Sequence, residues 1–417
     1  GALAFCFSDT LWFNGVESEV YATSSLFTAL VVFLMMKWNE VADNPGHERY
    51  LLLIAYILGL STGVHLLAIL TVFSIVMVIY FRKYEINTKS FILMGIIALV
   101  VFFITYQFVM MWLPTMLAGD SPFKNEARER IIEDSPVMTL FAIAIIGGAI
   151  ALLWYGIKRK YHMLKLATTF FLLILFGFTT YTQILLRSNA NPPMNENEPK
   201  NFPKLVSYLG REQYGEQRMW PRRTDYNDQQ KKYYYNQRDE NGNYVYGEWY
   251  EPETKRVVRK DGQAVSVPDW SNVNTEGELN YLWKYQIVHM YIRYFFWNFV
   301  GRQSDVQDAD FAFIDKGEAD ILNYKSGFAD KFPVRFFALP LLLGLIGLYF
   351  HFTKDKKMAW VFLVMFLMMG VLAAIAQNQQ NPQPRERDYF YTGSFMVFCM
   401  WIGLGTYALV EWIFKQK

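Results

Sequence analysis

The chain has 417 residues, of which 53% are hydrophobic and 18% aromatic, and its formal net charge is +2. This composition is too apolar for an ordinary soluble protein, and the small net charge gives no reason to expect nucleic acid as a partner. Cys6 and Cys399 both lie in or beside apolar runs, so the sequence indicates neither a disulfide framework nor a cysteine metal cluster.

The apolar residues gather in runs of about 20, the length that an α-helix needs to cross a bilayer. We therefore expect an all-α polytopic membrane protein with about eight or nine transmembrane helices. An apolar stub at 1–7 resembles the end of a membrane helix, so we expect an N-terminal part to be missing. The predicted spans are Val20–Met36, Tyr50–Phe81, Phe91–Leu113, Val137–Ile157, Leu166–Leu186, Val334–Phe352, Met358–Ala376 and Gly393–Trp412.

The run Tyr50–Phe81 is longer than one span requires. As a single helix it would measure about 48 Å, against about 30 Å for the hydrocarbon core. Small and polar residues interrupt it between Gly59 and His65. We predict two short helices with a bend there, and one long tilted helix is the alternative.

Lysine and arginine residues mark one side of the predicted membrane. By the positive-inside rule this side is cytoplasmic. The residues are Arg82, Lys83, Lys89, Lys158, Arg159, Lys160, Lys165, Lys354, Lys356, Lys357, Lys415 and Lys417. The long segment 188–333 then lies outside, which predicts an N-terminal transmembrane module at 1–187, an outer insert at 188–333 and C-terminal transmembrane helices at 334–417.

The outer insert is predicted to mix helices and strands. Phe202–Tyr214 has the pattern of a helix, and Asn241-Gly242 and Asp261-Gly262 are turn signals typical of β-hairpins. The aromatic segment Tyr281–Val300 is expected to lead back to the membrane, with its rings in the interfacial belt.

Three carboxylates lie at the mouth of the first complete span. Asp9, Glu17 and Glu19 stand between two apolar stretches, just before Tyr21. Ionised groups at the edge of the hydrocarbon are costly unless they face water or a partner, so we regard them as catalytic candidates. The alternative is a short loop of solvated acids.

A second charged motif, Arg385 to Tyr389, directly precedes the last span. Arg385 and Arg387 are candidates for binding a phosphate, because guanidinium groups bind phosphate bidentately and a helix N-terminus adds positive potential. Asp388 and Tyr389 would then line the rim of the site. Alternatively, the arginines pair with Glu386, Asp388 or another loop.

Tyr21 and three further residues are candidates for the rim of the site or for contact with an acceptor. His65 lies at the predicted bend, where a packed, hydrogen-bonded side chain is the commoner outcome. Asn195 and Glu196 belong to a cluster of amides and acids outside a span, and such groups bind sugar hydroxyls as well as loops and ions.

Carboxylates and arginines on one membrane face suit group transfer from a lipid phosphate. The sequence has no P-loop, no Rossmann glycine pattern and no Cys/His zinc spacing. A carboxylate can accept the proton of an incoming hydroxyl while arginine stabilises the departing phosphate. This hypothesis requires that Glu17 and Glu19 share one aqueous vestibule with Arg385 and Arg387.

Several motifs together resemble a known family. They are Ser8–Tyr21, Gly59–His65, Asn191–Pro199, Arg211–Tyr214, Phe296–Gln303 and Pro384–Tyr389. In order and spacing they resemble bacterial glycosyltransferase family 117, formerly a domain of unknown function, which is related to the protein O-mannosyltransferases of the GT-C superfamily. The resemblance implies a GT-C fold in the bacterial inner membrane, a periplasmic insert, a polyprenyl-phosphate sugar as donor and Ser/Thr hydroxyls of exported proteins as acceptors.

The resemblance also assigns expected roles. It implies an essential acid in an outer loop upstream of Gly1, and it places Glu17 and Glu19 in a second acidic element that positions the acceptor or a divalent cation. Membrane lipid, a lipid-linked sugar and envelope proteins are the expected partners. A lipid or solute transporter and a non-enzymatic envelope assembly factor are the alternatives.

Overall fold

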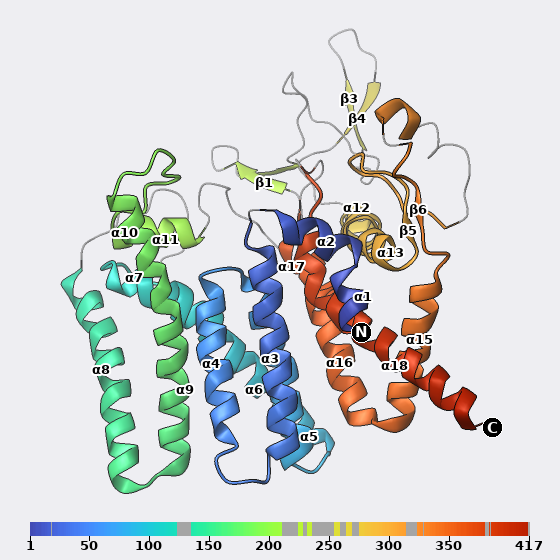
Figure 1. Cartoon of the computed structure of the whole chain (residues 1–417). Helices are drawn as coiled ribbons and strands as arrows, with labels where there is room; N and C mark the ends of the chain where they lie inside the picture. Colours follow the sequence, from blue (N-terminus) through green and yellow to red (C-terminus); the bar gives the residue numbers. More distant parts are fainter. Residues whose placement is uncertain are drawn as a thin grey trace. The chain divides into compact units, whose positions relative to one another are not determined.

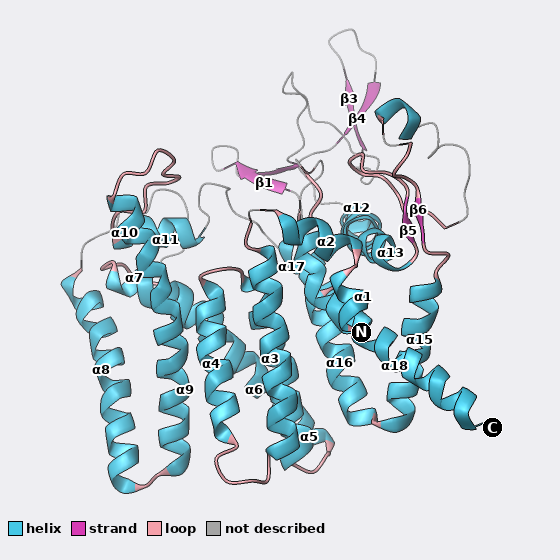
Figure 2. Cartoon of the chain, in the orientation of Figure 1, coloured by secondary structure: helices cyan, strands magenta, loops and turns pink. Residues whose placement is uncertain are grey.

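A computed structural model describes residues 1–17, 19–122, 135–210, 224–227, 232–235, 254–258, 264–268, 275–313, 323–327, 329–379, 383 and 385–415. The chain divides into two compact units. Unit 1 comprises Gly1–Phe13, Gln217–His351 and Phe366–Lys417, and unit 2 comprises Asn14–Glu216 and Phe352–Met365. Helices dominate the described residues, as Figure 2 shows. The predicted three-domain division stays a prediction.

Unit 2 is built from packed helices, among which α3, α4, α9 and α8 are successive neighbours (Figure 1). Its described elements are α3 (Tyr21–Val41), α4 (Glu48–Thr62), η1 (Leu66–Thr71), α5 (Val72–Lys83), α6 (Thr88–Phe103), the π-helix η2 (Ile104–Trp112), α7 (Leu113–Leu117), α8 (Pro136–Arg159), α9 (His162–Phe178), η3 (Thr179–Tyr181), α10 (Thr182–Asn189) and α11 (Phe202–Gly210).

The predicted bend in Tyr50–Phe81 is confirmed. Helix α4 ends at Thr62, and His65 is extended (φ −162°, ψ 146°) before η1 begins. The chain then returns to the side that it left, because Lys83 Nζ at the end of α5 donates to the backbone oxygen of Ala42 at 2.5 Å. Arg82 pairs with Asp43 at the same place. We call this the Asp43 end of unit 2, and the opposite one the His65 end.

Helices α4 and α9 touch through two glycines. A Cβ built on Gly59 would lie 2.1 Å from the carbonyl oxygen of Ile174, and one built on Gly177 would lie 2.5 Å from the backbone of Tyr56 and Leu60. Small residues allow membrane helices to approach until their backbones pack. In the sequence, Gly59 is one of the residues that interrupt the apolar run. In the structure, it is the point where the backbone of α4 packs against α9.

Gly59→Ala is expected to lower the stability of the protein by about 1–3 kcal/mol, because the two backbones must part to admit a methyl group. Unfolding by SDS in detergent micelles measures the effect. Gly147→Ala is the matched control, since nothing lies within 4 Å of a Cβ built there. Equal stability of the two variants would contradict the close contact.

Unit 1 contains the described strands and a set of aromatic-rich helices. Its elements begin with α1 (Ala2–Cys6) and α2 (Asp9–Val16), of which residues up to Phe13 belong to the unit. There follow β1 (Thr224–Asn227), β2 (Lys232–Tyr235), β3 (Thr254–Val258), β4 (Ala264–Pro268), α12 (Thr275–Asn280), the π-helix η5 (Tyr281–Ile292), α13 (Arg293–Phe299), β5 (Gly301–Arg302), β6 (Val334–Arg335), α17 (Val371–Gln377), η6 (Asp388–Tyr391) and α18 (Thr392–Lys415). Two helices cross the boundary between the units. In α15 (Leu339–Lys354) the chain passes from unit 1 to unit 2, and in α16 (Lys356–Met369) it returns to unit 1.

The described residues contain seven helices that are long and apolar enough to cross a membrane, which indicates a multi-pass membrane protein. They are Tyr21–Val41, Leu66–Lys83, Thr88–Leu117, Pro136–Arg159, His162–Asn189, Lys356–Gln377 and Asp388–Lys415. Leu339–Lys354 is a shorter apolar helix. The predicted start of this helix at Val334 is wrong, because Val334 and Arg335 pair with β5 in an antiparallel ladder.

The strand predictions have mixed outcomes. Strands β3 and β4 pair antiparallel on either side of Asp261-Gly262, as expected for a hairpin. Strands β1 and β2 form another antiparallel pair. The turn predicted at Asn241-Gly242 lies outside the described residues, as does the end of the helix predicted over Phe202–Tyr214, which is described only to Gly210.

The prediction of an interfacial belt over Tyr281–Val300 is wrong for three of its rings, although Trp283 in the same segment is exposed. Tyr291, Tyr294 and Trp297 are buried inside unit 1, where Tyr291 contacts Tyr391 and Phe395 of the last helical segment. The density of aromatic residues indicated an interface, but it reflects a packed aromatic core.

Candidate functional site

The most distinctive polar contact in unit 1 joins Asp9 to Arg302. Arg302 Nη1 donates to Asp9 Oδ2 at 3.1 Å, and both side chains are nearly buried, at 7% and 10% exposure. Among the described residues, Asp9 Oδ1 has no hydrogen-bond partner. One oxygen of this carboxylate is therefore held in place while the other is available to accept a proton.

The pKa of Asp9 is higher than that of an aspartate in water, so its protonated form is favoured. Burial raises the pKa of Asp9 to about 6, the charge of Arg302 opposes this shift, and the carboxylate of Asp388 adds to it. A carboxylate that titrates near neutrality is well matched to general acid–base work.

Two side chains fix the position of α2, where Asp9 is the first residue. The backbone N–H of Thr10 donates to Asn298 Oδ1 at 3.0 Å, and Asn298 Nδ2 donates to the Thr10 hydroxyl at 2.9 Å. Asn298 lies in α13, four residues before Arg302. The same short stretch of chain thus supplies both the partner of Asp9 and the clamp on its helix.

Arg302 is itself fixed by several contacts. Its Nη2 donates to Asp305 at 2.8 Å, and its Nε donates to the backbone oxygen of Ser304 at 3.0 Å. The guanidinium also lies 4.0 Å from the ring centre of Trp297. Because Arg302 keeps a second carboxylate partner, its charge is not balanced by Asp9 alone.

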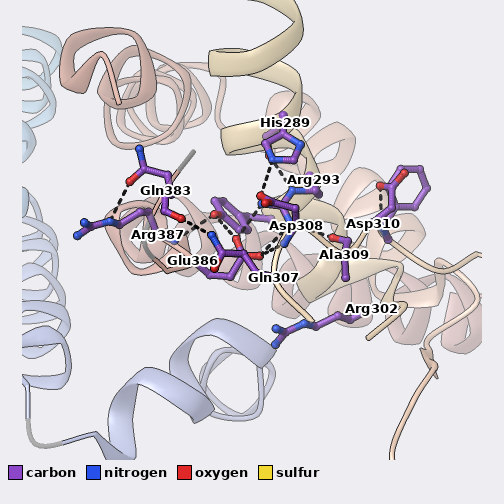
Figure 3. Close-up of polar contacts among 12 residues, drawn as sticks. His289, Arg293, Arg302, Gln307, Asp308, Ala309, Asp310, Gln383, Glu386 and Arg387 are labelled. Carbon is purple, nitrogen blue, oxygen red and sulfur yellow. Dashed lines mark hydrogen bonds and ion pairs between the residues drawn. The ribbon is translucent and has the colours of Figure 1, made fainter. Parts of the chain in front are cut away.

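A second buried ion pair is formed by Arg293, the first residue of α13. Arg293 Nη2 donates to Glu386 at 2.9 Å, and Arg293 is only 4% exposed. Glu386 also accepts from the Tyr294 hydroxyl at 2.6 Å and from the backbone N–H of Asp308 at 2.6 Å (Figure 3). Burial opposes ionisation here, but these bonds and the charge of Arg293 hold the pKa of Glu386 below its ordinary value.

Trp297 lies between the two ion pairs. The Arg293 guanidinium is 4.6 Å from its ring centre and the Arg302 guanidinium 4.0 Å from it. An aromatic face attracts a cation most strongly where water is excluded. The buried ring therefore lets two arginines lie close together without direct contact.

The arginine motif before the last span is arranged by Glu386. The carboxylate of Glu386 is taken by Arg293, so it does not neutralise Arg385 or Arg387. Arg387 Nε donates to Gln383 at 3.1 Å and its Nη1 to the Tyr389 hydroxyl at 2.6 Å. Within the described part of the chain, these neutral groups are the only side-chain partners of Arg387, which leaves its charge available for an anion.

The neighbours of Arg387 form part of the same site. Arg385 is exposed and lies 5.4 Å from the ring centre of Tyr389. Asp388 and Tyr389 are buried in η6, and Asp388 is close enough to Asp9 for their charges to interact. The structure thus brings Asp9 together with Asp388 in unit 1, the unit that also holds Arg385 and Arg387.

The remaining candidate residues belong to unit 2. Glu17 and Glu19 are exposed in the connection between α2 and α3. Tyr21 is buried at the start of α3, with its ring 6.4 Å from that of His65. The Nδ1 atom of His65 accepts from the backbone N–H of Leu67 at 3.3 Å, which gives it a helix-capping role.

Asn195 and Glu196 follow α10. Asn195 Nδ2 donates to the backbone oxygen of Ser188 at 3.2 Å, and Glu196 is exposed. Tyr181, just before α10, donates to the backbone oxygen of Thr62 at 2.7 Å, so this segment starts from the His65 end of unit 2. The shared vestibule for Glu17, Glu19, Arg385 and Arg387 stays a prediction.

The two arginines that hold the site together, Arg302 and Arg293, are not among the residues predicted for it. Arg302 lies in the motif Phe296–Gln303, which contributed to the resemblance but was given no role of its own. Arg293 lies in an aromatic segment that was assigned to the membrane interface. A cation within such a segment is costly unless it is paired, and this was the signal that could have found Arg293.

One comparison with known proteins bears on the N-terminal part. Residues 1–90 match the family model described as the N-terminal domain of the protein O-mannosyl-transferase TMEM260. This segment contains Asp9, Glu17, Glu19, Tyr21 and His65. No curated protein and no solved structure gives a significant match to the chain. The match supports a likeness to protein O-mannosyltransferases.

Proposed function

We propose that the protein is a membrane glycosyltransferase that transfers a mannose-like hexose from a polyprenyl phosphate to Ser/Thr hydroxyls of exported proteins. The similarity of residues 1–90 to a protein O-mannosyltransferase domain supports the class of reaction. The observation that carries the proposal is the Asp9 carboxylate, which is buried, held by Arg302 through one oxygen, and has a pKa of about 6.

In the proposed reaction Asp9 accepts the proton of the acceptor hydroxyl. The acceptor oxygen forms a bond to the anomeric carbon of the sugar while the bond from that carbon to the phosphate oxygen breaks. The electron pair of the broken bond leaves with the polyprenyl phosphate, and Arg385 and Arg387 stabilise the negative charge that develops there. Asp388 and Tyr389 line this part of the site.

The carboxylates of unit 2 have a supporting role in this proposal. Glu17 and Glu19 position the acceptor. The described residues contain no group of three or more His, Cys, Asp or Glu side chains that could hold a metal ion. Tyr21, Asn195 and Glu196 contribute to the rim, and His65 supports it by capping η1. Of the three acids before Tyr21, Asp9 has the environment that a general base requires.

The proposed setting is the bacterial inner membrane and a GT-C type of fold. The Asp43 end of unit 2 carries Arg82 and Lys83 together with Lys357, which donates to the backbone oxygen of Phe81. The positive-inside rule makes this end cytoplasmic. The His65 end of unit 2 is then periplasmic. In this proposal the insert is also periplasmic, so that envelope proteins are available as acceptors and partners.

Replacing both arginines of the motif tests the phosphate role. Arg385→Ala with Arg387→Ala in the full-length protein is expected to lower transfer from a polyprenyl-phosphate sugar to a peptide by about 10²–10³-fold, because donors aimed at developing charge contribute that much. Lys284→Ala with Lys331→Ala, which removes two exposed cations of unit 1, is the matched control and should transfer normally. Normal transfer by the arginine variant would overturn the phosphate role.

A further inference from the structure

The turn between α8 and α9 is unusually basic. It carries Lys158, Arg159, Lys160 and Lys165, which we call the basic turn, and all four side chains are exposed. The sequence has no aspartate or glutamate from residue 136 to residue 190. The two helices that meet at the turn both qualify as membrane spans, so these cations lie where a span would leave the hydrocarbon.

Other cations at this end of unit 2 have carboxylate partners, and those of the basic turn do not among the described residues. Arg82 and Lys83 at the same end of unit 2 both pair with Asp43, and Lys37 pairs with Glu40 at 2.8 Å. Among the described residues, the basic turn has no carboxylate partner for any of its four cations. The nearby Glu48 contacts His162 at 3.2 Å instead.

Exposed aromatic rings accompany these cations. Trp154 and Tyr161 are 62% and 54% exposed, and Tyr155 is also exposed. Lys158 Nζ lies 4.7 Å from the ring centre of Trp154, and the Arg159 guanidinium lies 5.9 Å from that of Tyr155. Amphipathic rings of this kind prefer the headgroup level of a bilayer. The rings and the cations therefore indicate the same depth in the membrane for this turn.

We propose that the basic turn binds the phosphate headgroups of anionic phospholipids in the adjacent leaflet. Four cations that have no carboxylate partner in the described part of the chain supply the charge, while Trp154, Tyr155 and Tyr161 fix the depth at which the charge meets the headgroups. An acidic protein would satisfy the cations equally well, but it would leave exposed rings next to a span without a function. The surface is distinct from the residues of the proposed transfer reaction.

Lipid retention measures this binding directly. The full chain is reconstituted in nanodiscs of phosphatidylcholine with phosphatidylglycerol, extracted in mild detergent, and its co-purifying lipids are quantified by mass spectrometry. The wild type is expected to retain phosphatidylglycerol in excess over its share in the nanodisc. Lys158→Gln with Arg159→Gln and Lys160→Gln should reduce this excess by roughly tenfold or more, because each cation near an anionic surface contributes about fivefold.

The matched control removes three paired cations from the same end. Lys37→Gln with Arg82→Gln and Lys83→Gln makes the same change in charge and should keep the excess of phosphatidylglycerol. Equal retention by the basic-turn variant and the wild type, or equal loss in both variants, would overturn the proposal. So would polyglutamate binding that depends on the basic turn while phosphatidylglycerol retention does not.

Discussion

Asp9→Asn is expected to lower sugar transfer by about 10²–10⁴-fold, the contribution typical of a positioned general base. The substitution keeps the size of the side chain and an oxygen that can accept from Arg302, but the amide cannot take up a proton. The fold should persist, because Arg302 keeps Asp305 and the clamp between Thr10 and Asn298 does not involve the carboxylate. Transfer from a polyprenyl-phosphate mannose to a Ser/Thr peptide, measured in detergent micelles, reports the rate.

Asp305→Asn is the matched control for this variant. It removes a carboxylate that pairs with the same guanidinium, but the Asp305 side chain is 41% exposed and accepts from Nη2 of Arg302, whereas Asp9 accepts from Nη1. Its transfer rate should stay within a few-fold of the wild type. A full rate in Asp9→Asn would assign the proton transfer to another acid, with Glu17 and Glu19 as the next candidates.

The pH dependence gives a second readout of Asp9. Because its pKa is raised to about 6, the basic form is gained as the pH rises through that value. Transfer should therefore increase with pH around 6 in the wild type, and this limb should be absent from Asp9→Asn. Stability should change in the opposite direction, since the folded state binds more protons than the unfolded state between the ordinary pKa of 3.8 and about 6. The contribution of Asp9 to stability is thus greatest below this window and declines as the pH rises through it.

Local patterns were enough to predict the helices and the break in the second long apolar run. Apolar length identified the spans, and the cluster of small and polar residues from Gly59 to His65 identified the bend. Both signals lie within short stretches of sequence. The burial of apolar side chains and the interruption of a helix are likewise decided by residues that are close together in the chain. The same reasoning failed at Val334, because Val334 and Arg335 form a short ladder with Gly301 and Arg302, so the apolar helix begins only at Leu339.

The pairing within the site could not be predicted in this way. Asp9 and Arg302 are separated by 293 residues, and Arg293 and Glu386 by 93. A single sequence contains no signal for which acid meets which base over such distances. It named Asp9 and the arginine motif as candidates from their positions beside spans, but their partners came from the folded chain. Trp297, which separates the two arginines, could not be distinguished from the other rings of its segment.

Glu386→Ala is expected to destabilise the protein by about 3–5 kcal/mol, because it leaves the buried charge of Arg293 without a counter-charge. Among the described residues, the remaining hydrogen-bond acceptors of Arg293 are the backbone oxygens of His289 and Ala309, which cannot replace a carboxylate. Unfolding by SDS in detergent micelles, followed by circular dichroism, measures the loss. Lys37→Ala, which breaks an exposed pair with Glu40, is the control and should leave the stability almost unchanged.

The double variant Glu386→Ala with Arg293→Met separates the charge from the packing. If the cost comes from an unpaired buried guanidinium, removing that guanidinium should restore a large part of the stability lost in Glu386→Ala. If the double variant is as unstable as the sum of the two single variants, the two side chains act independently and the pair does not hold the motif. Because Glu386 lies between Arg385 and Arg387, the same pair also fixes the backbone from which both arginines extend. Restored stability together with low transfer would therefore show that Glu386 positions the arginines as well as neutralising Arg293.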